Sequence, residues 1–167
     1  MGSCKGWLLQ IRRAEIDDRD VVLSWMNNEE LWAVDNPEPF SNKSAQEFDP
    51  SWNGLVSLSS TWIIDVADVS IGHLGWVPLT EEIGEFYIVI GDKTYWRKGI
   101  GRRAMAWMLA TAKHRQLTAL YGRVLGHNAT ALNFFRLCGF KPIARTENFF
   151  ERDGLSHDLH WIAHSLS

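Results

Sequence analysis

Residues 95–104 read YWRKGIGRRA, and this short stretch decides the fold. Two glycines, Gly99 and Gly101, open a segment, 101–115, whose apolar residues recur with helical spacing. Glycine lets backbone N–H groups come close to an anion, and a helix N-terminus directs positive charge to the same place. Four cationic side chains add to that charge: Arg97, Lys98, Arg102 and Arg103. The stretch therefore predicts a site for a pyrophosphate group.

A dinucleotide site is the first alternative, because residues 99–104 satisfy the pattern G-x-G-x-x-A after an expected strand. Such a site needs an Asp or Glu about 20 residues later to hold the ribose. No acidic residue occurs between positions 93 and 146, and the G-K-[ST] of a P-loop is missing from the glycine stretch. The other alternative is a glycine turn whose charges only keep the surface soluble.

Charge is distributed unevenly along the chain. Residues 1–92 hold 16 acidic and 5 basic residues, 93–146 hold 11 basic residues and no acidic one, and 147–167 hold 4 acidic residues and one basic. A basic block of this length suggests a polyanionic partner, either a phosphate-rich cofactor or nucleic acid. The plain alternative is a set of solvated basic faces.

Length and composition are those of one globular domain, with 167 residues, 46% of them hydrophobic and 22% charged. No apolar run is long enough to span a membrane, and the first residues lack the apolar core of a secretory leader. Cys4 and Cys138 do not suggest a disulfide framework, so a reduced, cytoplasmic setting is expected. His157, His160 and His164 lack the cysteine or carboxylate cluster that would complete a metal site, so none is expected.

Periodicity and turn signals predict a mixed α/β domain in the order β-α-(α)-β-β-β-α-β-α-β-β. The segment 35–54 is rich in Pro, Asn and Ser and is expected to be mostly loop, with one or two helical turns. The expected strands are 8–15, 60–68, 69–79, 84–91, 117–126, 141–150 and 156–164, and the expected helices are 17–28, 101–115 and 128–140.

Two longer segments carry a resemblance to a known family. EFYIVIGDKTYWRKGIGRRAMAWMLATA (85–112) resembles motif A of the GNAT superfamily of acyl-CoA-dependent N-acetyltransferases, and VLGHNATALNFFRLCGFKPIARTENFFERDG (124–154) resembles the motif B that follows it. The most similar branch contains ribosomal-protein N-terminal and spermidine acetyltransferases. The resemblance is strong from Gly84 to Gly154 and weaker over the N-terminal third.

This resemblance implies a partly splayed mixed sheet flanked by helices, with coenzyme A wedged between the fourth and fifth strands. It implies a single GNAT-type domain, 1–167, with an acceptor-side half (1–82), coenzyme A-binding motifs (83–154) and a closing strand (155–167). Acetyl-CoA would be the co-substrate, and the acceptor a primary amine of a small cationic molecule or a protein N-terminus, attacking directly in a ternary complex. No metal, nucleic acid or membrane partner is implied, and a homodimer is possible.

Site residues are implied position by position. Ile88, Val89 and Ile90 would offer backbone groups to the pantetheine amides, and a backbone N–H of the same stretch would serve the oxyanion. Asn128 would reach the pantetheine, with Ala131 and Phe135 beside it. The pyrophosphate would be wrapped by Trp96, Arg97, Lys98, Gly99, Ile100, Gly101 and Arg102.

Three positions depart from the family pattern. Trp96 and Arg97 replace the more usual Gln/Arg and Gly, and Arg97 cannot follow every glycine conformation without strain. Phe135 stands where many members have the tyrosine thought to protonate the departing thiolate. Other donors stay unranked: Tyr87, Tyr95, Tyr121 and His127. A coenzyme A-binding regulator without turnover is therefore an alternative function.

Glu85 is the candidate general base, because it starts the central strand where some superfamily members have a catalytic glutamate. Its other possible roles are to bind a cationic substrate or to lie exposed at a strand end. The acceptor amine is expected against an acidic and aromatic segment, unless this is an exposed acidic helix with its tryptophans in the core. That segment contains Trp25, Glu29, Glu30, Trp32, Asp35, Glu38 and Phe40.

Overall fold

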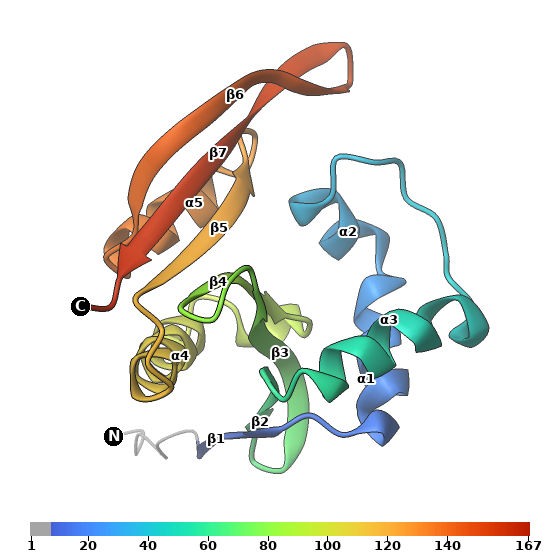
Figure 1. Cartoon of the computed structure of the whole chain (residues 1–167). Coiled ribbons are helices and arrows are strands. Elements are labelled where there is room, and N and C mark those ends of the chain that lie inside the picture. Colours follow the sequence, from blue (N-terminus) through green and yellow to red (C-terminus); the bar gives the residue numbers. More distant parts are fainter. Residues whose placement is uncertain (1–7) are drawn as a thin grey trace, which may run out of the picture.

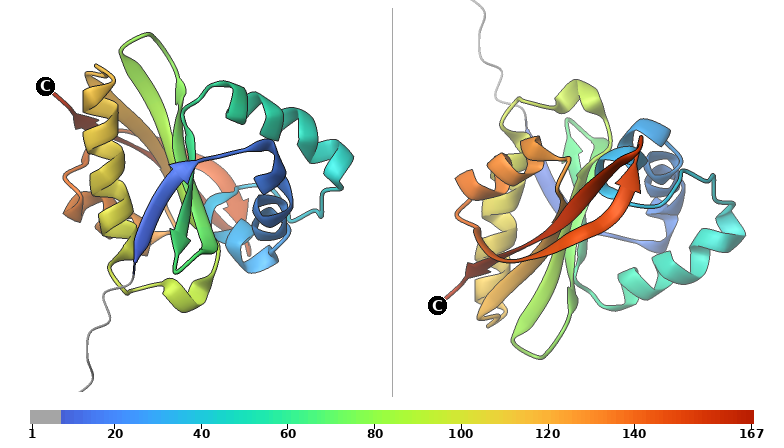
Figure 2. Two further views of the ribbon diagram at one scale, coloured as in Figure 1. Left: turned by 90° about the horizontal axis from the view of Figure 1, so that it is seen from below. Right: turned by 90° about the horizontal axis from the view of Figure 1, so that it is seen from above.

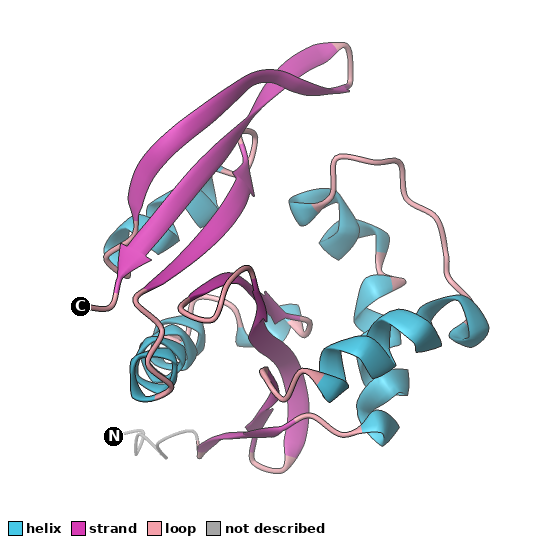
Figure 3. Cartoon of the chain, viewed as in Figure 1, coloured by secondary structure: helices cyan, strands magenta, loops and turns pink. Residues whose placement is uncertain are grey.

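The computed structural model describes residues 8–167 as a seven-stranded sheet with helices on both faces (Figures 1 and 3). The spatial strand order is β1-β2-β3-β4-β5-β7-β6, so β7 lies between β5 and β6. The strands are β1 Leu9–Arg13, β2 Thr61–Val66, β3 Val69–Pro78, β4 Ile83–Ile90, β5 Ala119–Leu125, β6 Lys141–Arg152 and β7 Leu155–Ser165. All seven predicted strands form, so the mixed α/β prediction is confirmed.

Two groups of helices cover the two faces of the sheet (Figure 2). The helices are α1 Arg19–Met26, α2 Glu29–Asp35, α3 Ala45–Ser57, α4 Ile100–His114 and α5 Ala129–Leu137, with 3-10 turns η1 Ile16–Asp18 and η2 Lys93–Tyr95. Buried residues of α4 pack with β2–β5 in the main core, and α5 adds partly buried side chains to it. On the other face α1 and α3 bury a second core around Trp25 and Trp52.

The centre of the sheet is a short parallel pair. β4 and β5 share a register over only three positions, Ile83 to Glu85 against Ala119 to Tyr121. β4 continues to Ile90 on β3, whereas β5 continues to Leu125 on β7. The two strands therefore part beyond Glu85, and the splayed sheet that the resemblance implied is present.

The expectation for residues 35–54 is wrong in its second half, where α3 runs from Ala45 to Ser57. The Ser44 hydroxyl caps this helix by accepting a hydrogen bond from the Glu47 amide, and the Glu47 carboxylate accepts one from the Ser44 amide. Phe48 and Trp52, one turn apart, are buried against α1 and the sheet. The helix forms although Pro50 lies inside it, because this capping and burial outweigh one lost backbone bond.

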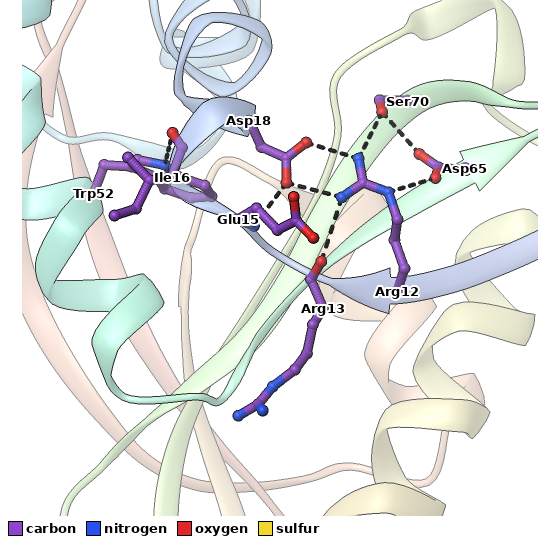
Figure 4. A network of polar contacts seen from close by, with 8 residues as sticks. All are labelled: Arg12, Arg13, Glu15, Ile16, Asp18, Trp52, Asp65 and Ser70. Atoms are coloured by element: carbon purple, nitrogen blue, oxygen red, sulfur yellow. Dashed lines mark hydrogen bonds and ion pairs between the residues drawn. The ribbon is translucent and has the colours of Figure 1, made fainter.

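The corner between β1, β2 and η1 is held by one arginine (Figure 4). The Arg12 guanidinium donates to Asp65 at 2.9 Å and to the two carboxylate oxygens of Asp18 at 2.7 and 2.9 Å. Asp18 also accepts from the backbone of Glu15, and Ser70 donates to Asp65. Burial alone would raise the pKa of Asp18, but these hydrogen bonds hold that pKa below its ordinary value.

Within 8–167 no helix has both the length and the apolar character of a membrane span. The same residues contain no group of three or more His, Cys, Asp or Glu side chains arranged to hold a metal ion. Cys138 is half-buried against the main core, and Cys4 lies outside the described residues.

Candidate active site

Helix α4 begins without a side-chain cap. Gly99 is its N-cap residue in the left-handed conformation, with φ 77°. The first helical bond runs from the Arg103 amide to the Gly99 carbonyl, so the amides of Ile100, Gly101 and Arg102 project from the helix end. Side chains cap three other helices: Asn28 caps α2, Ser44 caps α3 and Asn128 caps α5. The end of α4 therefore has the donors that an anion needs.

The charges around this helix end also favour an anion. Arg102 and Arg103 lie in the first turn, which contains no acidic residue, although cations are unfavourable at the positive end of a helix dipole. Arg97 adopts φ 60°, the left-handed conformation of a glycine, at a cost of about 1–2 kcal/mol. A bound polyanion would offset both free-energy costs, because it would form ion pairs with these side chains.

Backbone groups of β4 face the side from which β5 has parted. The Gly91 amide donates to β3 at 2.8 Å, which sets the alternation of this antiparallel ladder. Val89 accordingly directs its backbone groups to β3, while Ile88 and Ile90 direct theirs to the parted side. The Ile90 carbonyl accepts a 2.8 Å hydrogen bond from the Trp96 indole. Ile88 is thus the predicted residue best placed to pair with an extended ligand.

Helix α5 borders the same parting. Asn128 accepts from the Ala131 amide at 3.0 Å and donates to the Val34 carbonyl of α2 at 3.2 Å. Asn128 is thus the N-cap of α5, and its amide group links α5 to α2. Phe135 packs edge-on against Phe86, with ring centroids 5.1 Å apart. Residue 135 is thus part of an aromatic cluster, where a phenylalanine fits without a hydrogen-bond partner.

The opposite face of the parted strands carries an ion pair. Glu85 of β4 accepts from Arg123 of β5 at 2.5 Å, and the Arg123 guanidinium lies 5.8 Å from the Trp161 ring. Strand alternation places Tyr87 on the same face of β4 as Glu85. The Tyr87 hydroxyl contacts Thr61 at 2.5 Å, and burial raises the pKa of Tyr87 to about 12. Tyr87 is therefore a poor proton donor to a thiolate.

Asp35, at the end of α2, is the carboxyl group with the most perturbed pKa near this face. Asp35 is an exposed residue. Desolvation of its carboxyl group by the surrounding protein nevertheless raises the pKa of that group to about 6. The charge of Arg123 opposes that rise. Nothing in the sequence distinguishes Asp35 from the acidic residues near it.

The predicted acceptor residues separate in the structure. Trp25 is buried and stacks on His73, with centroids 5.9 Å apart, so it belongs to the core. Glu30 pairs with Lys93, and Glu29 is exposed in the first turn of α2. Trp32 is half-buried beside Phe40, with its indole bonded to the Glu38 carbonyl at 2.9 Å.

No pattern in the sequence predicts two of the contacts that α2 makes. Arg152 of β6 bonds to carbonyls at the end of α2, and His127 lies against the same turn. These residues are about 90 to 120 positions from α2 in the chain, so only the fold brings them together. Two surface hollows, beside Arg19 and beside Arg115, contain none of the predicted site residues.

Comparison with known proteins agrees with this geometry. The spermidine N-acetyltransferase of Vibrio cholerae, in complex with CoA and spermine, matches with TM-score 0.78 and 20% identity over 95% of each chain. Ribosomal-protein-alanine N-acetyltransferase of Brucella melitensis matches with TM-score 0.78 and 17% identity over 93% of this chain and 99% of that one. The yncA protein of Salmonella typhimurium, solved with its cofactor acetyl-CoA, matches with TM-score 0.81 and 14% identity over 95% and 94%.

These similarities to solved structures concern the fold, and no curated protein sequence matches the chain. The family itself is shown by a sequence model described as the acetyltransferase (GNAT) family, which matches residues 25–140. That match spans more than half of the chain and includes the parted strands, the glycine turn and α5. The chain therefore belongs to the acetyltransferase (GNAT) family.

Proposed function

We propose that this acetyltransferase moves an acetyl group from acetyl-CoA to a primary amine by direct attack in a ternary complex. The acceptor is a small cationic molecule or a protein N-terminus. The observation that carries the proposal is the uncapped, cation-rich start of α4 beside the parted strands β4 and β5. Spermidine and ribosomal-protein acetyltransferases among the structural neighbours support an amine acceptor.

The residues present fit coenzyme A. Its diphosphate would be held by the turn from Trp96 to Arg102, which contains both the uncapped helix start and three cationic residues. Its pantetheine would pair with the backbone of Ile88 in the parting, between β4 and α5. The thioester would supply the activated acetyl group. Val89, Asn128, Ala131 and Phe135 would line the site by their position, although Asn128 already bonds to α2.

The acceptor would bind on the face that carries Glu85. The proposal keeps the division of the domain into an acceptor-side half (1–82), coenzyme A motifs (83–154), to which Glu85 belongs, and a closing strand (155–167). Glu85 would hold the acceptor ammonium or take its proton, because a carboxylate stabilises the cation before the proton leaves. Glu29, Glu30 and Trp32 of α2 would contribute to the approach of a cationic acceptor.

Departure of the thiolate does not require the missing tyrosine. A thiol has a pKa of about 8.5, so its thiolate leaves without an acid at neutral pH. The aromatic cluster around Phe135 would instead present an apolar wall to the ligand.

One experiment separates this function from its alternatives. Free thiol is measured while the protein is incubated with acetyl-CoA and a panel of amines: spermidine, an aminoglycoside, an amino sugar and a peptide with a free N-terminus. We expect thiol release with at least one amine and none without it. Tight coenzyme A binding, measured by calorimetry, with no release from any amine would favour the regulator. Binding of neither acetyl-CoA nor coenzyme A at millimolar concentration would exclude both functions.

A further inference from the structure

Three side chains form a row across the neighbouring strands β4, β5 and β7, at the place where the sheet parts (Figure 1). Glu85 stands at the end of the shared register of β4 and β5. Arg123 lies two residues beyond the partner of Glu85 on β5, and it is paired in turn with Trp161 on β7. Residues two apart on a strand, and residues paired across strands, project from the same face of a sheet. The row therefore lies on the face where the acceptor is proposed to bind.

Arg123 is held in this row from two sides. Its Nε donates to Oε1 of Glu85 at 2.5 Å, and its guanidinium lies 5.8 Å from the Trp161 ring, which is a cation–π contact. The Trp161 indole is itself held by a 3.2 Å hydrogen bond to the Thr146 hydroxyl. These contacts leave the end of the guanidinium open, because neither Nη1 nor Nη2 of Arg123 donates to any group within residues 8–167.

Glu85 likewise keeps one oxygen for a ligand. Oε1 accepts the hydrogen bond from Arg123, whereas Oε2 accepts none from the part of the chain that the structure describes. Both side chains are partly exposed, so a small molecule can reach them. An acceptor would therefore find a carboxylate oxygen beside two guanidinium N–H groups, and the ion pair that orients them would stay intact.

This arrangement of opposite charges selects among amines. A polyamine has further ammonium groups, which Arg123 would repel, and it has no oxygen to which a guanidinium could donate. An α-amino acid has an ammonium and a carboxylate joined through one carbon. Its planar carboxylate matches the two parallel N–H groups at the end of a guanidinium. The two charges of such an acceptor could reach Glu85 and Arg123 together, because those two side chains are themselves in contact.

We propose that Arg123 is a specificity-determining residue, which binds the carboxylate of an α-amino acid while Glu85 binds its ammonium. The inference rests on the proposed function and narrows its primary amine to this class of acceptor. A peptide N-terminus also has an oxygen close to its ammonium, but that carbonyl is neutral and offers one oxygen where a carboxylate offers two. A free amino acid is therefore the better partner for the guanidinium.

The first test compares acceptors that differ in one group. The common amino acids are screened for release of free thiol from acetyl-CoA, beside spermidine and a peptide with a free N-terminus. The best amino acid is then compared with its amide and with the amine that lacks its carboxyl group. We expect kcat/KM for the amino acid to exceed that for either analogue by about 10-fold or more, because both analogues lose a charge-assisted hydrogen bond to Arg123.

The second test removes the guanidinium and compares each acceptor with itself, so that differences in basicity between acceptors cancel. Arg123→Met should raise the KM for the amino acid by about 30-fold or more. The KM for the amine without a carboxyl group should stay the same or fall, since Glu85 no longer has a competing cation. Arg123→Lys should restore part of the loss, because an ammonium keeps the charge but not the planar pair of donors.

Arg145→Met is the matched control. Arg145 is 53% exposed, against 51% for Arg123, and it is paired with Glu147 as Arg123 is with Glu85. Its replacement should change the KM of no acceptor. Coenzyme A affinity, measured by calorimetry, should be the same in the wild type and in all three variants, which separates acceptor binding from a general disturbance of the fold.

Equal increases in KM for the amino acid and for its decarboxylated amine in Arg123→Met would mean that Arg123 only supports Glu85. That result would overturn the inference and leave the proposed function intact. Spermidine or the peptide reacting better than every amino acid would do the same. A wild-type protein that releases no thiol with any amine or amino acid would instead overturn the proposed function, and the inference with it.

Discussion

Glu85 of β4 stands at the last position at which β4 and β5 share a register, and it pairs with Arg123, two residues beyond that position on β5, with Oε1 2.5 Å from Nε. Their side chains are 28% and 51% exposed, and an ion pair so open to water contributes at most about 1 kcal/mol to stability. The pair therefore contributes little to holding the sheet, and it presents a carboxylate and a guanidinium on the face where we propose that the acceptor binds.

Glu85→Gln removes the charge but keeps the shape of the side chain. If Glu85 binds the acceptor ammonium, the KM for the amine should rise about 10- to 100-fold, which corresponds to the loss of one hydrogen bond to a charged group. Steady-state kinetics at saturating acetyl-CoA measure this change. Glu81→Gln, in the exposed β3–β4 turn, serves as the control. A fall in kcat together with loss of the pH dependence would make Glu85 the base.

The region from Gly84 to Gly154 could be predicted from the sequence because its signals are local. Alternating apolar residues, the glycine turn and the Asn128 cap each act within a few positions. The segment before Gly84 is harder to predict from the sequence. Helix α3 depends on a capping box and on burial against α1, and both outweighed the loop signal of Pro50.

Gly101→Val tests the anion site at the start of α4. A Cβ at this position would already lie 3.4 Å from the Phe134 ring, so the two methyl groups of valine would press α5 away and cover the first amides of the helix. We expect acetyl-CoA affinity to fall at least 10-fold, as measured by calorimetry. Ala110→Val introduces the same side chain at an exposed position of α4 and should leave affinity unchanged. Equal affinity in Gly101→Val would place the diphosphate elsewhere.

The surroundings of α2 could not be derived in the same way, because their contacts connect distant parts of the chain. Arg152 reaches Ala33, and Lys93 pairs with Glu30, across separations that no local pattern encodes. Aromatic residues added a second ambiguity. Size and hydrophobicity suit both a core and a binding wall, and the fold assigns Trp25 to the core.

Arg12→Met should destabilise the fold by about 3 kcal/mol at pH 7, because it leaves two carboxylates at a buried corner without their cation. This destabilisation should be smaller at acidic pH. Since the pKa of Asp18 is lower in the folded protein than in the unfolded chain, its contribution is present above about pH 4 and is lost as the pH falls through the folded value. Urea unfolding at pH 7 and pH 3 measures both states. Arg13→Met, beside it but exposed, should change little; a loss equal to that of Arg12→Met, or one independent of pH, would contradict this account.

Asp35→Asn should make the folded protein more stable at pH 7. Burial raises the pKa of Asp35 to about 6, so the folded state holds the proton more tightly than the unfolded chain does. The stability linked to that proton is fully present below about pH 4 and is lost as the pH rises through about 6. Asparagine carries no charge, so the variant should exceed the wild type in Tm at pH 7, and the two should converge near pH 4. Asp68→Asn, in an exposed turn, should show no such convergence. A lower Tm at pH 7 for Asp35→Asn would mean that the carboxylate is paired within the fold.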